Sequence, residues 1–351
     1  MNTHFLEQVW YFGSWSDRLA VGQAKEVVLA GKRLAIYRSE GGEVAAIGNR
    51  CPHRFSPLHR GKVKGDNLEC PYHGLQFGQN GKCVFSPHNN GAVPPLRVPS
   101  YSVIERDGAI WIWLSQQVAP NPALIPDMSE LTTYPSTVVV DVPTMYINGS
   151  YELLADNLMD PTHADFVHLG KLGNGLISTR RGSTTVTNGT VETEWNWQGP
   201  VGPIPHLNQF LPNAERDDTW LKVRWNAPGV IRLENGVTPS GQPREEGFWV
   251  IAFHIFMPSG ERTTTYDVRT LRSYRTDDTE LTAKGAQFAN QLFNNEDKPI
   301  IEAQQAAMGD AEFWDLSPAL LPSDGPSVKV RRTLASMLEA ERGAMRALEG
   351  Q

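Results

Sequence analysis

Cys51-Pro52-His53 and Cys70-Pro71-Tyr72-His73 decide how this chain is interpreted, and 16 residues separate His53 from Cys70. Thiolates are soft, anionic ligands that suit iron–sulfur clusters, whereas a neutral imidazole adds no charge to the iron that it binds. Two Cys on one iron and two His on the other form a [2Fe–2S] cluster of the Rieske type, which has a raised reduction potential. We therefore expect Cys51, His53, Cys70 and His73 to hold such a cluster, and the chain to carry electrons.

A structural zinc site is the alternative for the same four residues, because two thiolates and two imidazoles also bind Zn²⁺. The surrounding sequence favours the cluster. Short apolar runs at 27–29, 34–37, 44–47 and 109–114 are typical of strands, and turn compositions separate the first three. Zinc modules are usually short and isolated, whereas this pattern predicts a small β domain that holds a metal between two loops.

Composition limits the class of protein. With 351 residues the chain is long enough for about two domains. The net charge of −7 and the lack of a long basic run give no reason to expect nucleic-acid binding. The sequence shows no 18-residue apolar stretch and no export signal at its start, so we expect no membrane span and a cytoplasmic location. Cys83 is the third cysteine, and its role is open.

The first motif resembles the Rieske domain of Rieske non-haem iron oxygenases. The resemblance rests on Cys51-Pro52-His53-Arg54, on Cys70–Phe77, and on the later strand Ile110-Trp111-Ile112-Trp113. It implies a Rieske [2Fe–2S] domain over residues 1–118 and a catalytic domain over residues 119–351. The implied fold class is α+β, and its second domain has a curved antiparallel sheet with flanking helices, of the helix-grip or START-like kind.

A second metal signature follows in the run from Asp160 to His168, which reads Asp-x-x-His-x4-His. Non-haem iron(II) oxygenases hold iron with two His and one carboxylate on one face, which leaves positions open for oxygen and substrate. Two His five residues apart are by themselves most often incidental, and they do not align on a regular helix. Together with the cluster, however, they resemble the iron site of this family. We expect His163 and His168 to bind iron, with a helix that is distorted or ends between them.

The third iron ligand is expected in a helix that begins near Asp277-x-x-Glu280, which has the form of a capping box. The sequence around Asp297 resembles the Glu-Asp-Lys stretch of the family, in which the Asp is the ligand. Glu296 is the competitor. Adjacent residues on a helix point about 100° apart, so only one of the two can face the iron.

The resemblance gives Asp160 a different role. In the trimers of this family, the aspartate three residues before the first iron-binding His connects to a cluster-binding His of the neighbouring subunit. The matching residues place Asp160 between His73 of one chain and His163 of the next. The simpler interpretation is that Asp160 is a helix N-cap ahead of Pro161, and both roles are compatible. Asn157, one turn upstream, is a further candidate near the iron.

The substrate pocket is harder to predict. Asn188-Gly189 predicts a hairpin turn, and residues 247–255 form an apolar strand interrupted by His254. A His at the matching place contacts the polar group of the substrate in demethylating members of the family, although a hydrogen-bonded core His is an equal alternative. Phe288 lies where the resemblance places an aromatic lining residue, with core packing as its alternative.

The resemblance to the vanillate and dicamba O-demethylase group implies the oxygenase component of a monooxygenase, a homotrimer that uses O₂ to demethylate a methoxylated aromatic acid with release of formaldehyde. Its cofactors would be one cluster and one mononuclear iron(II) per chain. A nucleotide-binding Gly-x-Gly-x-x-Gly after a strand is missing, so NAD(P)H and flavin would act through a separate reductase. A ferredoxin-type cluster in that reductase is a further expectation. The alternatives are a ring-hydroxylating dioxygenase, a methyl hydroxylase and a Rieske electron-transfer protein.

Overall fold

The computed structural model describes residues 4–88, 90, 92–134, 138–199, 202–211 and 217–349. The chain divides into two compact units. The first unit consists of the chain up to Thr132, residues 257–261 and the part from Glu341 on, and the second consists of residues 133–256 and 262–340. The expected end of the Rieske domain at residue 118 stays a prediction.

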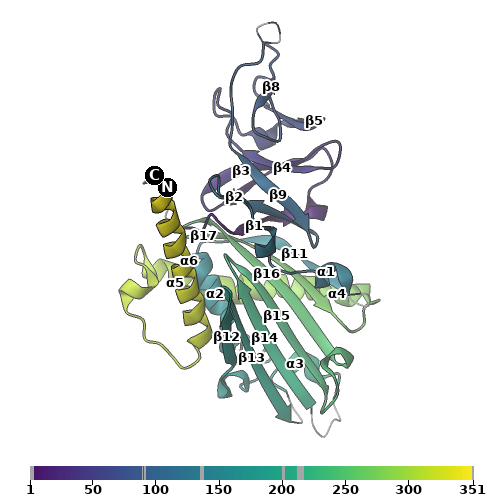
Figure 1. Ribbon diagram of the computed structural model, residues 1–351. Coiled ribbons are helices and arrows are strands. Elements are labelled where there is room, and N and C mark those ends of the chain that lie inside the picture. The colour runs from purple at the N-terminus through teal and green to yellow at the C-terminus, as the bar shows by residue number, and fades with distance from the viewer. Residues whose placement is uncertain are drawn as a thin grey trace. The chain divides into compact units, whose positions relative to one another are not determined.

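The first unit is built from β-sheet, as Figure 1 shows in purple and blue. Its six-stranded sheet has the order β1-β10-β9-β4-β3-β2, and a four-stranded sheet has the order β5-β6-β7-β8. The strands are β1 (Trp10–Trp15), β2 (Ala24–Leu29), β3 (Lys32–Arg38), β4 (Val44–Gly48), β5 (Lys62–Lys64), β6 (Asn67–Glu69), β7 (Gln76–Phe77), β8 (Cys83–Phe85), β9 (Ser100–Arg106) and β10 (Ala109–Trp113).

Tight turns connect the larger sheet of the first unit. Ala30-Gly31 joins β2 to β3, and Asp107-Gly108 joins β9 to β10, with positive φ at all four residues. Two-residue turns of this kind match the twist of antiparallel strands. The strands predicted at 27–29, 34–37, 44–47 and 109–114 are confirmed as parts of β2, β3, β4 and β10, so the first unit is the predicted β domain.

The second unit contains a seven-stranded antiparallel sheet of order β11-β17-β16-β15-β14-β13-β12, drawn mainly in teal and green in Figure 1. The strands are β11 (Val138–Ile147), β12 (Ser183–Thr187), β13 (Thr190–Gly199), β14 (Asp217–Asn226), β15 (Val230–Pro239), β16 (Phe248–Gly260) and β17 (Thr263–Arg272). Asn188 and Gly189 have positive φ and close the β12–β13 hairpin, as predicted. Cross-strand register places Trp225, Ile231 and His254 in one row.

The helical segments fall mostly in the second half of the chain. They are η1 (Ser16–Arg18), η2 (Leu58–Arg60), η4 (Pro122–Leu124), α1 (Glu130–Thr133), α2 (Tyr151–Met159), η5 (Pro161–Asp165), η6 (Ile177–Thr179), α3 (Pro205–Asn208), η7 (Arg244–Glu246), α4 (Thr279–Leu292), η8 (Phe293–Asp297), α5 (Lys298–Met308), η9 (Phe313–Leu316) and α6 (Gly325–Glu349).

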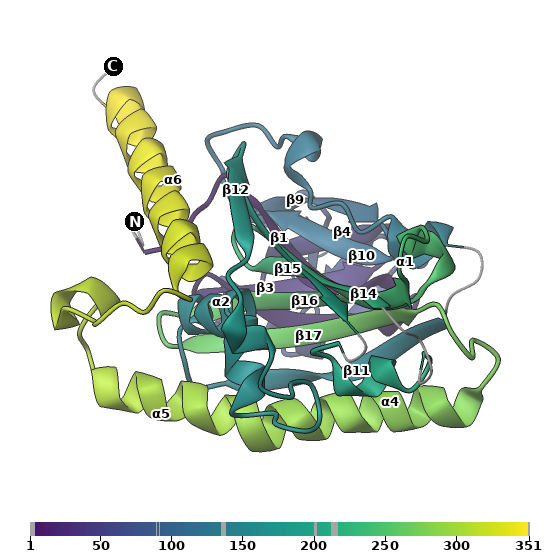
Figure 2. The same cartoon turned by 90° about the horizontal axis from the view of Figure 1, so that it is seen from below.

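The run from α4 to α5 forms one long helical stretch beside the sheet, and α4 packs on β11 (Figure 2). The start predicted for this stretch is off by one residue. Asp278, and not Asp277, is the N-cap, since its carboxylate accepts a hydrogen bond from the backbone N–H of Leu281 at 2.8 Å. A π-helical turn, η8, separates α4 from α5 and ends at Asp297. Among the described residues, no helix combines the length and the apolar character that a membrane crossing requires.

A buried ion cluster ties α6 to α2. Arg331, whose side chain is 6% exposed, pairs with Glu152 at 2.5 Å and with Asp156 at 2.6 Å. Burial raises the pKa of Asp156 and Glu152, and the charge of Arg331 opposes that rise. The guanidinium also lies 4.1 Å from the ring centroid of Phe313. Because α2 leads into the second metal motif, Asp160–His168, this ion cluster holds the helix that precedes the iron site.

We expect Arg331→Leu to destabilise the protein by about 3 kcal/mol, because it leaves two partly buried carboxylates without their buried cation. Denaturant unfolding followed by tryptophan fluorescence measures the change. Arg332→Leu is the matched control, since the adjacent Arg332 is exposed. Equal stability of the two variants would contradict a structural role for the ion cluster.

Candidate metal centre and cluster-binding loops

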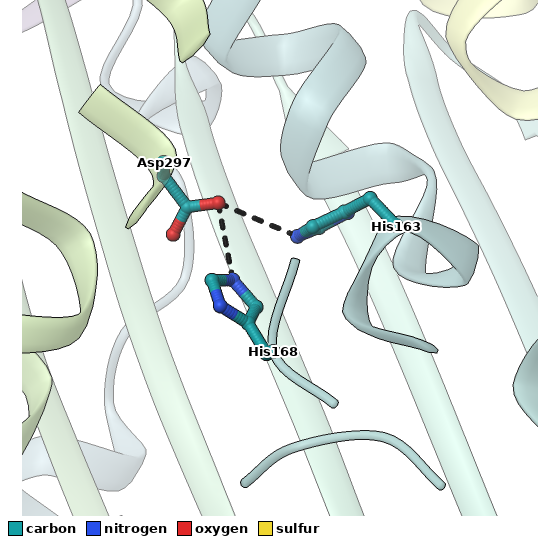
Figure 3. A group of neighbouring side chains, drawn as sticks. All are labelled: His163, His168 and Asp297. Carbon is teal, nitrogen blue, oxygen red and sulfur yellow. Dashed lines mark hydrogen bonds and ion pairs between the residues drawn. The ribbon is translucent and has the colours of Figure 1, made fainter. Parts of the chain in front are cut away.

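His163, His168 and Asp297 converge on one point in the second unit, as Figure 3 shows. One ligand atom from each lies within 4.8 Å of the other two. Asp297 Oδ1 is 3.1 Å from His168 Nε2 and 3.6 Å from His163 Nε2. His168 is 2% exposed and Asp297 is 6% exposed. Two imidazoles and one carboxylate in this arrangement match the facial triad of non-haem iron sites.

The end of a short helix brings the two His together. Helix α2 stops at Met159, Pro161 starts η5, and η5 ends at Asp165, between His163 and His168. The expectation that a helix ends between the two His is therefore confirmed. This break lets two rings that are five residues apart face the same point, with ring centroids 5.2 Å apart.

Hydrogen bonds to a buried carboxylate stabilise the loop after His168. The buried carboxylate of Asp165 accepts hydrogen bonds from the N–H of Gly175 at 2.9 Å and from that of Ser178 at 2.7 Å. A Cβ on Gly173 would lie 2.6 Å from the backbone of Ala164, closer than real side chains come. Only glycine therefore fits at this point, and the loop closes tightly behind the metal-binding rings.

The π-helical turn η8 presents two adjacent carboxylates to the same ring. Asp297 faces Nε2 of His168, while Glu296 Oε2 accepts a hydrogen bond from Nδ1 of His168 at 2.7 Å. Glu296 also pairs with Lys171. Burial alone would raise the pKa of Glu296, but the hydrogen bonds from Lys171 and His168 outweigh it and hold this pKa below its usual range. Glu296, the competing candidate for the third ligand, thus lies on the far side of the ring from the triad.

Hydrogen bonds at the back of each ring fix which nitrogen faces the metal position. Nδ1 of His163 donates to the backbone carbonyl of Asp160, and Nδ1 of His168 donates to Glu296. Both Nε2 atoms are left to bind a metal, which is the usual arrangement of metal-binding histidines. Asn157, on α2, donates to Asp297 Oδ1 at 3.1 Å and so contacts the triad, as its position upstream of the motif had suggested.

Electrostatics at the triad favour a cation. Burial lowers the pKa of His168, but Asp297 and Glu296 raise it by more, so the net shift is upward. The ring therefore lies in a field of negative charge. The donor set of two imidazoles and a carboxylate, together with this field, fits a divalent iron.

Asp160 has the predicted capping role. Its Oδ1 accepts from the N–H of Thr162 at 3.0 Å and from the hydroxyl of Thr162 at 2.6 Å. Within the chain its contact to His163 runs through its backbone carbonyl, and the bridge to His73 of a neighbouring chain stays a prediction. Oδ2 makes no hydrogen bond to any described residue of the chain, so this oxygen is available to an outside group.

The four cluster residues lie at the tips of two loops in the first unit. Cys51 and His53 follow β4, and Cys70 and His73 lie between β6 and β7. The rings of His53 and His73 are 4.5 Å apart. Burial raises the pKa of the Cys51 thiol to about 11, and the nearby thiol of Cys70 adds to the rise. The two loops thus bring the four side chains together in pairs.

The loops fit a [2Fe–2S] cluster. Nδ1 of His73 is buried and has no hydrogen-bond partner among the described residues. A buried polar atom without a partner is costly, and a metal ligand is expected to have this character. Cys83 is different, because it is buried in the apolar core of the same unit and its thiol donates to the carbonyl of Phe85 at 3.4 Å.

The two candidate substrate residues differ in their placement. His254, on β16, is mostly buried, and its Nδ1 is 2.5 Å from the hydroxyl of Tyr266. The ring of Tyr266 packs on Phe293, in the same π-helical turn as Asp297, so the pair lies near the triad. Phe288, on α4, is 45% exposed in the single chain and makes no ring contact to the triad among the described residues. Its role as a lining residue stays a prediction.

Sequence reasoning missed three contributors: Lys171, Tyr266 and the positioning contact of Glu296. Lys171 lies only three residues beyond His168, where a cation next to a buried carboxylate could have been considered. Tyr266 lies on a separate strand and has no motif around it. The contact of Glu296 depends on the π-helical turn, and no residue type signals such a turn.

Comparison with known proteins agrees with this geometry. A family model described as the Rieske [2Fe–2S] domain matches residues 9–102, and one described as the vanillate O-demethylase oxygenase C-terminal domain matches residues 147–340. An iron-dependent oxygenase with a Rieske cluster is the class of protein that the fold and the two sites define. The chain belongs to the Rieske non-haem iron oxygenases, in the group that contains vanillate and dicamba O-demethylases.

Full-length relatives support this assignment. The oxygenase component of chloroacetanilide N-alkylformylase from Rhizorhabdus wittichii is 35% identical and covers 96% of this chain and 97% of its own. The oxygenase component of dicamba O-demethylase from Stenotrophomonas maltophilia is 32% identical, over 96% and 99%. A crystal structure of dicamba monooxygenase bound to dicamba superimposes with a TM-score of 0.88 at 31% identity, over 97% of this chain and 99% of that one. The cofactors are therefore a Rieske [2Fe–2S] cluster and a non-haem iron at a His-His-Asp site.

We expect Glu296→Ala to weaken iron binding about 10- to 100-fold, because His168 loses the acceptor that orients it. The iron affinity of Glu296→Gln should lie between those of the wild type and Glu296→Ala, since the amide oxygen of Gln still accepts a hydrogen bond. Iron retained against a chelator measures the effect, and the absorbance of the cluster should stay unchanged. Glu280→Ala, at an exposed position of α4, is the control. Iron retention equal to that of the control would contradict the positioning role.

Proposed function

We propose that this terminal oxygenase O-demethylates a methoxylated aromatic acid. The observation that carries the proposal is the His-His-Asp site in a domain whose family model is that of vanillate O-demethylase, with a neutral, mostly buried His254 close by. Hydroxylation of the methoxy carbon gives a hemiacetal, which collapses to a phenol and formaldehyde. One atom of O₂ enters the product, and the other leaves as water with two electrons and two protons.

We assign Cys51, His53, Cys70 and His73 as the cluster ligands, and His163, His168 and Asp297 as the iron ligands. The cluster supplies single electrons, and the iron supplies a place where dioxygen reacts close to the substrate. The side chains of this chain orient the metal-binding rings and shape the charge around them. Asn157 contributes by holding Asp297 Oδ1.

Assembly as a homotrimer would complete the electron route. We propose that the free Oδ2 of Asp160 accepts a hydrogen bond from His73 of a neighbouring copy. The support is that Oδ1 of Asp160 caps η5 and its backbone carbonyl accepts a hydrogen bond from His163, so that neither contact within the chain uses Oδ2. A carboxylate that accepts an imidazole N–H fixes the orientation of that ring. The electrons would come from NAD(P)H through a separate reductase that carries flavin.

Hydroxylation of an N-alkyl group is a second candidate. The relative with 35% identity is named for an N-alkyl substrate. Attack on a carbon next to nitrogen follows the same course, since the carbinolamine that forms also collapses with loss of an aldehyde. Product analysis separates the two candidates.

We expect turnover of a methoxylated aromatic acid to release formaldehyde and the matching phenol in equal amounts. The measurement is a screen of methoxylated, N-alkylated and methylated aromatic compounds with a surrogate reductase, in the presence of ¹⁸O₂. One labelled oxygen in the formaldehyde, trapped before it exchanges with water, and none in the phenol support a monooxygenase that hydroxylates the methyl carbon. Two labelled oxygens on the ring would mean dihydroxylation and would overturn the proposal.

We expect Asp160→Asn to keep both metals while turnover falls about 10- to 100-fold. The single-turnover rate at which a reduced cluster is oxidised, with substrate and O₂ present, reports the transfer step directly. Thr162→Val is the matched control, because it removes a hydrogen bond to Oδ1 and leaves the carboxylate in place. An unchanged oxidation rate in Asp160→Asn would rule out the bridging role.

A further inference from the structure

His254 and Tyr266 form a closely fixed pair beside the metal triad. The Tyr266 hydroxyl lies 2.5 Å from His254 Nδ1, and the two ring planes differ by 11°. The hydroxyl thus meets the nitrogen near the plane of the imidazole, where its lone pair or its hydrogen lies. Tyr266 is 2% exposed, and its ring packs on Phe293, the first residue of η8, with centroids 4.4 Å apart.

The hydroxyl has few choices for its hydrogen. His254 Nδ1 is its only hydrogen-bond partner among the described residues. If Nδ1 carried the imidazole hydrogen, it would donate to the Tyr266 oxygen, and the hydroxyl hydrogen would be buried without an acceptor. An unsatisfied buried donor is costly. The favoured arrangement is therefore O–H of Tyr266 donating to Nδ1, with the imidazole hydrogen on Nε2.

The imidazole of His254 carries only one N–H hydrogen, because the ring is neutral. Burial lowers the pKa of His254 to about 4, although the charge of Asp297 opposes the shift, so the ring is neutral at ordinary pH. Nε2 makes no hydrogen bond to any residue in the described part of the chain. Its N–H is therefore available to a bound molecule.

We propose that Tyr266 is a positioning residue that fixes His254 as a hydrogen-bond donor through Nε2–H, so that the enzyme selects aromatic substrates that present an acceptor oxygen, such as a carboxylate. This inference rests on the proposed function and gives it a chemical basis for the choice of substrate. A molecule with only donors at that place, such as an amidinium, would meet another donor and bind poorly. Selectivity would thus be set by a residue that does not touch the substrate.

Two planar probes of matched shape test the proposal: 4-methoxybenzoate, whose carboxylate only accepts, and 4-methoxybenzamidine, whose amidinium only donates. Calorimetry on the iron- and cluster-loaded protein without oxygen gives the two dissociation constants. Tyr266→Phe keeps the ring on Phe293 but frees the hydrogen to move to Nδ1. We expect the preference for benzoate over benzamidine to fall about tenfold in this variant.

A double-mutant cycle separates this effect from a general loss of structure. His254→Ala should reduce the preference, and Tyr266→Phe should change it no further in that background. Tyr37→Phe, which removes a tyrosine hydroxyl from the first unit, is the control and should leave the preference unchanged. If Tyr266→Phe fails to fold, the comparison of wild type with His254→Ala still tests the donor.

The inference would be overturned if the wild type did not prefer benzoate, or if either His254→Ala or Tyr266→Phe kept the wild-type preference. It would also be overturned if Tyr266→Phe changed the preference equally with and without His254. Formaldehyde release from methoxylated acids alongside any of these would leave the proposed function standing. A shifted preference without formaldehyde release would support the donor and count against demethylation.

Discussion

The metal centre depends on two neighbouring carboxylates, Glu296 and Asp297, that contact the two nitrogens of the His168 imidazole. Glu296 and Asp297 are adjacent in the π-helical turn η8 and point in different directions. Asp297 therefore reaches Nε2 of His168, while Glu296 reaches Nδ1 of the same ring. Such turns occur often at functional sites. The rest of the site, from Asn157 to Lys171, arranges itself around these two carboxylates.

Different atoms of Asp160 also make hydrogen bonds to different neighbours. Its Oδ1 begins η5, and its carbonyl sets the orientation of His163. Substitution of the side chain therefore alters the cap and the free oxygen but leaves the contact to His163 in place. The proposed bridging role of Asp160 can therefore be tested without loss of the contact that orients His163.

Much of this could be predicted from sequence because the information is local. The Cys-x-His and Cys-x-x-His pairs carry their own chemistry, and the five-residue spacing of His163 and His168 required a break that η5 provides. Asp297 was found through the family resemblance, since nothing nearby distinguishes it from Glu296. The π-helical turn has no residue signature, and Tyr266 contacts His254 through sheet pairing, so their roles follow only from the fold. The exposure of Phe288 in the single chain could not be predicted either, because the position of a residue on a helix does not show what covers its side chain.

The iron site and the proposed substrate contact lie in different parts of the second unit. The triad comes from η5, the loop after it and η8, whereas His254 and Tyr266 belong to adjacent strands of the sheet. Phe293 connects the two parts, because it opens η8 and packs on Tyr266. If the proposal for His254 and Tyr266 holds, a change on the sheet would alter which polar group is accepted without disturbing the metal ligands. Relatives that share about a third of their residues and carry the names of different substrates are consistent with this separation. We propose that the hydrogen on His254 belongs to this second part, set by a hydroxyl that the substrate does not touch.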